Sequence, residues 1–406
     1  MIRHLLKMVW NRKRTNFFII LEIFFSFLVL FAVITFGVYY ADNYRQPLGF
    51  NYQNIWDVSI QPQGNNTKED KSGPIINAKQ IFQAVQELAE VEAVAGIQAA
   101  PYGNSRSSSA VEVHGREIPY GFNEASDSFK DLIGLEVVRG RWFNSEDEVA
   151  NYRPIVINQR LSRAAFGDED PIGKRLGDPP KIKANSTAEE RKEQRVIGVI
   201  TDFRQEGELS VPGNYIFERQ SVNLPTDRPP TQLFIKVRPG TTAAFEEKLL
   251  RQLQAVAKGW SFNIEPLANM REATFKLYLA PIIAAGLVAI FLMIMVALGL
   301  TGVLWQNVTQ RTKEIGLRRA KGATAGKIHL QILGELVVIA SFGLALGVAI
   351  IIQFPLLDLI GFISSKVYLS SLALSLTLIY LLTILCGLYP SWLATKVHPA
   401  EALHYE

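Results

Sequence analysis

The chain has 406 residues, of which 48% are hydrophobic and 20% charged, and its formal net charge is +4. This small charge, without a basic tract interleaved with aromatic residues, argues against nucleic acid as a partner. The single cysteine, Cys386, excludes an internal disulfide and any metal site built from several cysteines. Apolar residues concentrate in one stretch near the N-terminus and three near the C-terminus, and the middle resembles ordinary soluble protein.

The N-terminal region predicts a membrane anchor. Residues 1–16 are basic, and residues 17–40 form the first apolar run. A run of about 20 apolar residues spans a bilayer as a helix. It is longer than the apolar part of a cleaved signal peptide, about 7–15 residues, and no small-x-small cleavage site follows Tyr40. We therefore expect a retained transmembrane helix.

Residues 41–276 predict a large extracytoplasmic domain of mixed α/β structure. Alternating or apolar runs predict strands at residues 56–60, 110–113, 154–157, 195–200 and 232–237. Helical spacing of apolar residues predicts helices at residues 78–94 and 242–257. A strand–helix unit thus occurs near each end, which predicts a layer closed by both ends of the segment. The middle, about residues 105–230, would be inserted as a second lobe, with a turn at Gly140 and a solvated loop at residues 179–193.

The outer segment has no recognisable catalytic residues. His114 is its only histidine and has no partner at ligand spacing, and there is no HExxH, CxxC or GxSxG motif. We therefore expect no catalytic residue, no metal site and no cofactor on this chain, and we expect that it is not an enzyme.

Three further apolar runs predict transmembrane helices at residues 277–305, 330–354 and 369–389. Pro281 lies near the expected outer start of the first of these helices, and Pro390 is expected to end the last. Residues 355–368 predict a short outer loop, and residues 390–406 a cytoplasmic tail.

Basic residues predict the orientation of these helices. Residues 1–16 and the loop at residues 306–329 are rich in Lys and Arg, which are retained on the cytoplasmic side. Crossing parity then places residues 41–276 outside and both termini in the cytoplasm. Every loop agrees with this one topology.

Two acids, Glu22 and Glu335, lie inside apolar runs, where an ionisable group is costly. They either face headgroups or pair with a nearby Lys or Arg, or they anchor helix contacts within a dimer. A proton pathway is a third interpretation, although no chain of further acids or histidines accompanies them. Gly343 and Gly347 form a small-xxx-small pair, which favours close helix packing either within the chain or at a dimer interface.

The cytoplasmic loop is not a nucleotide site. Residues 322–327 have three residues between the glycines where a Walker A loop needs four, and Ile328 replaces the required Ser or Thr. Residues 311–327 mix apolar residues with cations. This pattern is typical of an amphipathic helix at a membrane surface, or of a helix that docks in a groove of a cytoplasmic partner.

At this loop the sequence resembles a known family. Residues 314–320, followed by Gly322 and Ala323, resemble the EIGxxxAxGA signature of the MacB/FtsX-type ABC permeases. The tail resembles the C-terminus of the same family at Pro390, Ala394, Pro399, Ala402 and Leu403. The outer segment resembles the MacB-type periplasmic core at residues 140–143, 154–158, 166–167, 170–174 and 196–203. The resemblance covers nearly the whole chain.

The resemblance implies an α-helical membrane protein with four transmembrane helices and a two-lobed α/β outer domain. It further implies a dimer with a second copy or a paralogue, on a separate ABC ATPase that binds ATP and Mg²⁺. MacB itself carries its ATPase in the same chain, and this sequence departs from that pattern. The ATPase-coupling residues implied are Arg311, Lys313, Glu314, Ile315, Gly316, Arg318, Arg319, Ala320, Gly322 and Ala323.

The function implied is that of a permease subunit in the bacterial inner membrane. It would transmit ATP-driven motion to its periplasmic domain, termed mechanotransmission, for export or extraction of a substrate. Membrane lipid surrounds it, and an adaptor (membrane-fusion) protein and an outer-membrane channel are further candidate partners. The alternative is an FtsX-like regulatory protein that controls a cell-wall hydrolase or acts as a sensor, although FtsX proteins usually have a much smaller outer domain.

Overall fold

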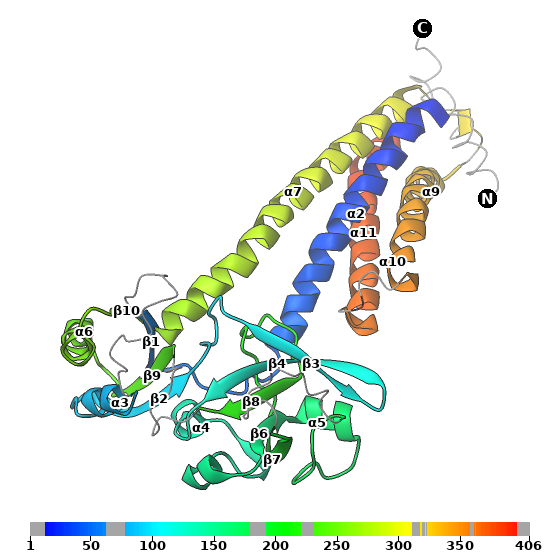
Figure 1. Ribbon diagram of the computed structural model, residues 1–406. Coiled ribbons are helices and arrows are strands. Elements are labelled where there is room, and N and C mark those ends of the chain that lie inside the picture. Colours follow the sequence, from blue (N-terminus) through cyan, green and yellow to red (C-terminus); the bar gives the residue numbers. More distant parts are fainter. Residues whose placement is uncertain are drawn as a thin grey trace, which may run out of the picture. The chain divides into compact units, whose positions relative to one another are not determined.

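The structure, a computed structural model, describes residues 13–61, 78–178, 192–220, 231–310, 323–357 and 363–395, with residues 317, 318, 321 and 361. The chain divides into two compact units. One comprises Met1–Asp42 with Tyr278–Glu406, and the other comprises Asn43–Leu277. The first unit is helical, and the second is built on a β-sheet (Figure 1).

Within the described residues, four helices are long and apolar enough to cross a membrane, as predicted. At about 1.5 Å per residue, the 44 residues of α7 extend about 66 Å, roughly twice the hydrocarbon thickness of a bilayer. The short helix α10 (Gln353–Leu356) follows the third of the four. The four long helices are α2 (Lys13–Tyr44), α7 (Leu267–Gln310), α9 (Ala325–Ile351) and α11 (Ser365–Thr395).

Two prolines lie inside helices and not at their ends, contrary to prediction. Pro281 is internal to α7 because this helix begins at Leu267 instead of residue 277. Pro390 is internal to α11, which continues to Thr395. Proline removes one backbone donor, but a membrane helix tolerates this loss where neighbouring groups satisfy the freed carbonyl. A proline in an apolar run is therefore a weak stop signal.

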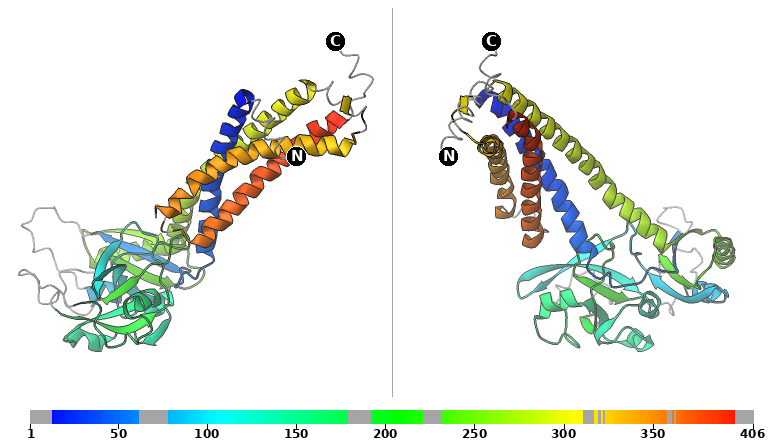
Figure 2. Two further views of the ribbon diagram at one scale, coloured as in Figure 1. Left: turned by 90° about the vertical axis from the view of Figure 1, so that its right-hand side faces the viewer. Right: turned by 180° about the vertical axis from the view of Figure 1, so that it is seen from behind.

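The helices of the first unit pack closely at glycines. A Cβ atom added to Gly343 of α9 would lie 2.9 Å from the carbonyl oxygen of Ile20, and one added to Gly347 would lie 2.3 Å from the ring of Phe27. Both contacts are with α2. The pair Gly343 and Gly347 therefore serves packing within the chain, the first of the two predicted alternatives. Figure 2 shows the four helices from two further directions.

The second unit has ten described strands in one mixed sheet, in the order β10-β1-β9-β2-β4-β8-β6-β7-β5, with β3 paired to β4. The pairs β4–β8 and β6–β7 are parallel, and the other pairs are antiparallel. The strands are β1 (Ile55–Gln61), β2 (Val91–Ile97), β3 (Ser107–Val113), β4 (Arg116–Ala125), β5 (Val137–Gly140), β6 (Arg153–Asn158), β7 (Gln194–Ile200), β8 (Tyr215–Arg219), β9 (Gln232–Val237) and β10 (Ser261–Pro266).

The sheet has two halves, in line with the two-lobed fold class predicted for the outer domain. Strands β2 and β4 meet through one residue pair, Ile97 with Ala125. The terminal half, β10-β1-β9-β2, is covered by two helices on one apolar core. The inserted half contains strands β3 to β8 in chain order and has a separate apolar core beneath the helix at residues 159–166. A third apolar core contains residues of both halves. The described helices that lie wholly within this unit are α3 (Ala78–Gln86), α4 (Phe129–Ile133), α5 (Gln159–Phe166) and α6 (Ala244–Val256), with the 3-10 helix η1 (Ser145–Val149).

One helix is shorter than predicted. Helix α3 ends at Gln86, and the last part of the expected helix at residues 78–94 is strand β2. The β2 segment pairs with β9 from Val91 to Ile97 and with β4 at Ile97. Sheet pairing thus overrides a helical spacing that Val91 happened to continue. Residues 179–191 of the predicted loop lie outside the described residues.

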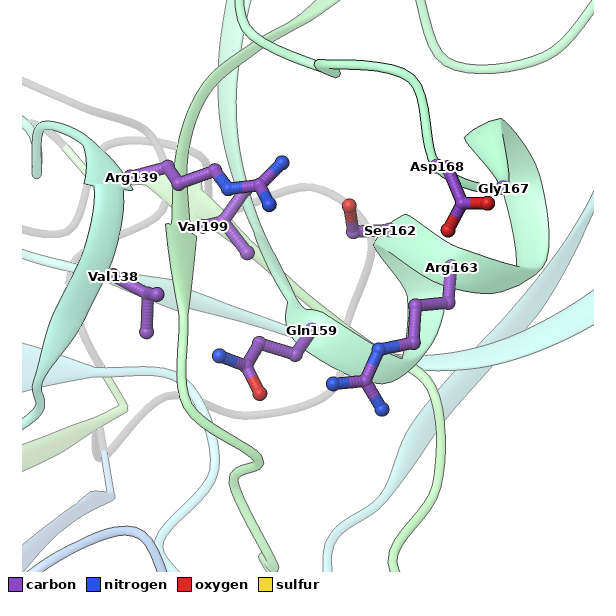
Figure 3. Close-up of a pocket in the computed structure, with 8 residues that line it drawn as sticks. All are labelled: Val138, Arg139, Gln159, Ser162, Arg163, Gly167, Asp168 and Val199. Carbon is purple, nitrogen blue, oxygen red and sulfur yellow. The ribbon is translucent and has the colours of Figure 1, made fainter.

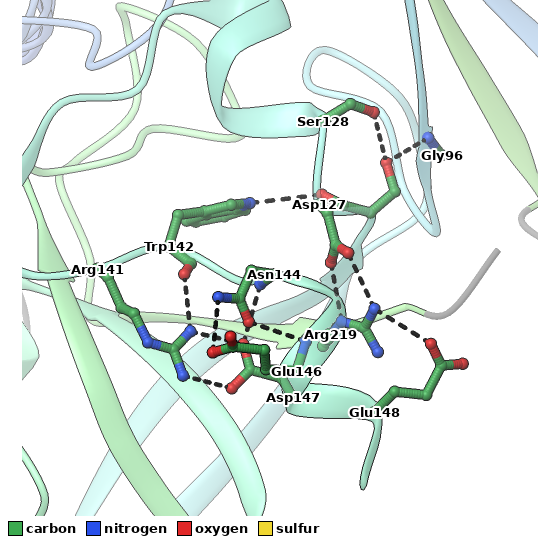
Figure 4. Close-up of polar contacts among 11 residues, drawn as sticks. Gly96, Asp127, Ser128, Arg141, Trp142, Asn144, Glu146, Asp147, Glu148 and Arg219 are labelled. Atoms are coloured by element: carbon green, nitrogen blue, oxygen red, sulfur yellow. Dashed lines mark hydrogen bonds and ion pairs between the residues drawn. The ribbon is translucent and has the colours of Figure 1, made fainter. Parts of the chain in front are cut away.

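A polar network joins the two halves (Figure 4). Arg219 of β8 donates two hydrogen bonds to Asp127, at 2.8 and 2.9 Å. Arg141 donates two hydrogen bonds of 2.6 Å to Asp147, which is nearly fully buried. The indole of Trp142 donates to the backbone oxygen of Ser126, and the hydroxyl of Ser126 accepts from the backbone amide of Gly96 in β2. Arg141 and Trp142 belong to the family-like motif at residues 140–143, so this motif has a structural role.

A buried carboxyl lies in the terminal half. Asp57 of β1 is 4% exposed and pairs across the sheet with Phe234 and Glu265. Its Oδ1 atom has no hydrogen-bond partner among the described residues. Burial, and secondarily the charge of Glu265, raise the pKa of Asp57 to about 8.

Candidate functional site

The predicted coupling segment connects α7 and α9. Of the residues predicted to couple to the ATPase, the structure describes Arg318 and Ala323, and the Ala323 amide donates to the Arg318 carbonyl at 3.0 Å. Ala323 lies directly before Thr324, the N-cap residue of α9, and Arg318 precedes it in the sequence. The other predicted coupling residues lie outside the described residues: Arg311, Lys313, Glu314, Ile315, Gly316, Arg319, Ala320 and Gly322.

A polar chain leads from this segment into α9. The Nη1 atom of Arg318 donates to Oε1 of Gln331 at 2.7 Å, and Nε2 of Gln331 donates to Oε1 of Glu335 at 3.4 Å. Gln331 and Glu335 are four residues apart, so they share one helix face. The structure therefore brings together Arg318 and Glu335, which were predicted separately. Gln331 is not among the predicted residues, although its spacing of four residues to Glu335 was an available signal.

Glu22 has a different environment. Its carboxylate packs against Gly299 of α7, where an added Cβ would lie 2.7 Å from Oε2. Glycine at this position lets a half-buried acid on α2 approach the α7 backbone. The two intramembrane acids therefore have different environments. Glu22 lies at the contact between α2 and α7, and Glu335 lies at the end of the hydrogen-bonded series that starts at Arg318.

The outer end of α2 is held by a buried arginine. Arg204, 2% exposed, follows β7 in a loop at residues 204–210. Its guanidinium donates to the carbonyl oxygen of Asn43 at 2.9 Å and to that of Gln46 at 3.1 Å. It also donates to the carbonyls of Glu208, at 2.5 Å, and of Ser210. A cation at a helix C-terminus complements the exposed carbonyls and the helix dipole there.

The same loop holds the outer part of α7. Arg271 Nε donates to Oε1 of Glu208 at 2.6 Å, and the hydroxyl of Tyr102 donates to Oε2 of Glu208 at 3.1 Å. The Arg271 guanidinium also lies 4.6 Å from the ring centroid of Tyr52. Burial and the neighbouring Glu208 raise the pKa of Tyr102, so its hydroxyl stays protonated and remains a donor.

We call residues 204–210, with their contacts to α2 and α7, the outer clamp. It joins the ends of two helices that are far apart in the sequence. The outer clamp was not predicted from the sequence, although the family-like motif at residues 196–203 ends directly before Arg204. Within the part of the chain that the structure describes, no group of three His, Cys, Asp or Glu residues could hold a metal ion.

Two family descriptions match most of the chain. Residues 17–252 match the MacB-like periplasmic core domain, and residues 286–399 match the FtsX-like permease C-terminal domain. The first match alone covers more than half of the chain.

The individual proteins that the chain resembles are also ABC transporter permeases or contain one. The chain is 29% identical over 298 residues to the macrolide export ATP-binding/permease protein MacB of Bdellovibrio bacteriovorus, an alignment that covers 69% of this chain and 43% of that protein. It therefore spans less than half of that relative. It is 23% identical over 428 residues to the uncharacterized ABC transporter permease YvrN of Bacillus subtilis, covering 100% of this chain and 99% of that protein.

Among solved structures, the periplasmic region of MacB from Actinobacillus actinomycetemcomitans matches with a TM-score of 0.37 and 16% identity, over 55% of this chain and 93% of that chain. Family membership therefore rests on the sequence matches. With its four apolar helices and its periplasmic core domain, the chain is an inner-membrane protein with a large extracytoplasmic domain. It belongs to the MacB/FtsX-type ABC transporter permease family.

Proposed function

We propose that this chain is the permease subunit of a MacB-like ABC transporter and transmits the motion of a separate ATPase to its periplasmic domain. The substrate would be exported, or extracted from the membrane. The outer clamp carries this proposal, because one loop binds the outer ends of both α2 and α7 through Arg204 and Glu208. A movement of either helix would therefore act on the same loop of the sheet domain, residues 204–210.

The clamp is suited to transmit force because its contacts are short and charged. Hydrogen bonds to charged groups contribute about 1.5–3 kcal/mol each, more than neutral ones. Helix α7 runs without interruption from Leu267 to Gln310, so movement at its inner end is not absorbed by a loop. The Arg318–Gln331–Glu335 chain would give α9 a corresponding polar contact with the coupling segment.

The proposed assembly contains several other proteins besides this chain. ATP and Mg²⁺ would be bound by the ATPase subunit, with the coupling segment docked on it in the cytoplasm, where both termini would also lie. A second permease copy or a paralogue would complete the dimer. Apolar residues of α7 exposed within this chain, such as Leu287 at 64% and Phe291 at 60%, are suited to face lipid or that second copy. An adaptor and an outer-membrane channel would extend the route.

Co-purification tests the energy source. The tagged chain would be co-expressed with its neighbouring ATPase gene and purified in mild detergent, alongside the variants Arg318→Ala and Arg251→Ala. Arg251 lies on the exposed face of α6, so its variant is a matched loss of one arginine outside the coupling segment. We expect the ATPase to co-purify with the parent and the Arg251 variant and to be lost or uncoupled with Arg318→Ala. An ATPase that never binds the parent would favour the regulatory alternative.

A distance measurement tests transmission itself. A spin label at exposed Ser109 on β3, in a Cys386→Ser background, would report the separation of two outer domains in the dimer. We expect ATP with vanadate to shift this separation in the parent and Glu208→Gln to reduce the shift without releasing the ATPase. An equal shift in both would show that motion does not pass through the outer clamp.

A further inference from the structure

A small pocket lies on the inserted half of the outer domain. Its volume of about 140 Å³ is roughly ten times what one buried water needs. It is smaller than the roughly 300–1,000 Å³ of sites for drug-sized ligands. The pocket therefore fits a compact polar group. The lining residues that matter here are Val138, Arg139, Gln159, Ser162, Arg163 and Asp168 (Figure 3).

Two arginines enter this pocket from different elements. Figure 3 shows the side chains of Arg139, from β5, and Arg163, from α5, at separate points of the pocket lining, and Ser162 and Gln159 line the same pocket. Neither guanidinium forms an ion pair with any described residue. Several other arginines of the same unit are paired: Arg141 with Asp147, Arg153 with Glu218, Arg219 with Asp127 and Arg271 with Glu208. Two arginines and one carboxylate, that of Asp168, give the pocket a net positive charge, which favours an anion.

The backbone directs Arg139 into the pocket. Successive side chains of a regular strand point to opposite faces. The β5–β7 register shifts between Val137 and Arg139, and Val138 and Arg139 both line the pocket. Such a bulge re-aims a side chain. Gly140, at φ +68°, follows directly, and an added Cβ would lie 2.2 Å from the carbonyl oxygen of Ile197, so only glycine fits. The position of Arg139 is therefore built into the fold.

We propose that this pocket binds a protonated phosphate group, either free phosphate or the phosphate monoester of a lipid headgroup. Arg139 and Arg163 donate to its oxygens, because the guanidinium fork matches an oxoanion. The Ser162 hydroxyl and the Gln159 amide are further donors. The carboxylate of Asp168 lines the same pocket and accepts the O–H of the phosphate group. Sulfate carries no such proton at neutral pH and is therefore rejected.

Calorimetry on the full chain in phosphatidylcholine nanodiscs tests this site. Inorganic phosphate is titrated at constant ionic strength, with sulfate as the comparator. We expect saturable phosphate binding with a Kd below about 5 mM and binding of sulfate at least about tenfold weaker. Arg139→Gln and Arg163→Gln should each weaken phosphate binding at least about tenfold. Arg116→Gln removes an exposed arginine from β4 of the same half and should leave binding unchanged.

A third titration, with short-chain phosphatidic acid, distinguishes free phosphate from a lipid headgroup as the source of the bound phosphate group. Binding at least about tenfold tighter than phosphate assigns the site to a lipid headgroup, and equal or weaker binding assigns it to free phosphate. The proposal is overturned if neither phosphate compound binds saturably, if sulfate binds equally, or if Arg116→Gln weakens binding as much as the pocket variants. Circular dichroism confirms that each variant is folded. The ATPase is absent from this experiment, so its outcome is independent of the proposed transport function.

Discussion

Replacing Arg204 by methionine should open the outer clamp. The side chain keeps its bulk, but the carbonyl oxygens of Asn43 and Glu208 lose their buried donor. An unsatisfied buried group costs about 1–3 kcal/mol, so these two together predict about 3 kcal/mol of local destabilisation. The other two carbonyls, of Gln46 and Ser210, are only partly buried and can bind water instead. The loss is therefore local and need not unfold the domain.

Hydrogen–deuterium exchange of the full chain measures this opening. A loss of about 3 kcal/mol raises the open population roughly 100-fold, and amide exchange accelerates in proportion when reclosing is fast. The reporters are the amides of Gln46, which donates to Asn43, and of Gly207, which donates to Arg204. Peptides covering residues 43–48 and 204–210 contain them.

Two further variants sharpen this test. Arg204→Lys keeps the charge but loses the fork, so its effect should be intermediate. Arg251→Met removes an exposed arginine whose surface ion pair contributes little, so exchange at the clamp should not change. Acceleration below about threefold in Arg204→Met, in a folded protein, would refute the reasoning that buried carbonyls depend on Arg204.

Three other predictions concern separate sites. The pKa of Asp57 is raised to about 8 in the folded state, so between about pH 4 and 8 the folded state holds a proton on this carboxyl that the unfolded state has lost. The free energy of unfolding should therefore fall by up to about 1.4 kcal/mol per pH unit as the pH rises through this range. Asp57→Asn should remove this dependence in thermal unfolding curves, and an unchanged slope would contradict it. Gly347→Ala should lower thermal stability in detergent by about 1–3 kcal/mol through its clash with α2, whereas Gly286→Ala, in open space, should not. Gln331→Leu should weaken stimulation of the partner ATPase severalfold by separating Arg318 from α9, and full stimulation would argue that the polar chain is only structural.

The transmembrane helices were predictable because their signal is local. An apolar run of sufficient length must form its backbone hydrogen bonds internally in a membrane, whatever its neighbours are. The strands at Gln232–Val237 and Gln194–Ile200 were likewise visible as apolar or alternating runs. The helix ends at Pro281 and Pro390 were misjudged because tolerance of an internal proline depends on packing around the helix.

The sequence by itself determined the membrane topology class, the mixed outer domain and the family, since periodicity, hydropathy and short motifs are properties of neighbouring residues. Only the tertiary structure decided which residues form the sites. Arg204 and Asn43 are 161 residues apart, and Arg271 and Glu208 are 63 apart. The bulge that aims Arg139 depends on the register of β5 against β7. Such contacts depend on sheet pairing and close packing, and no local pattern encodes which distant segments will meet.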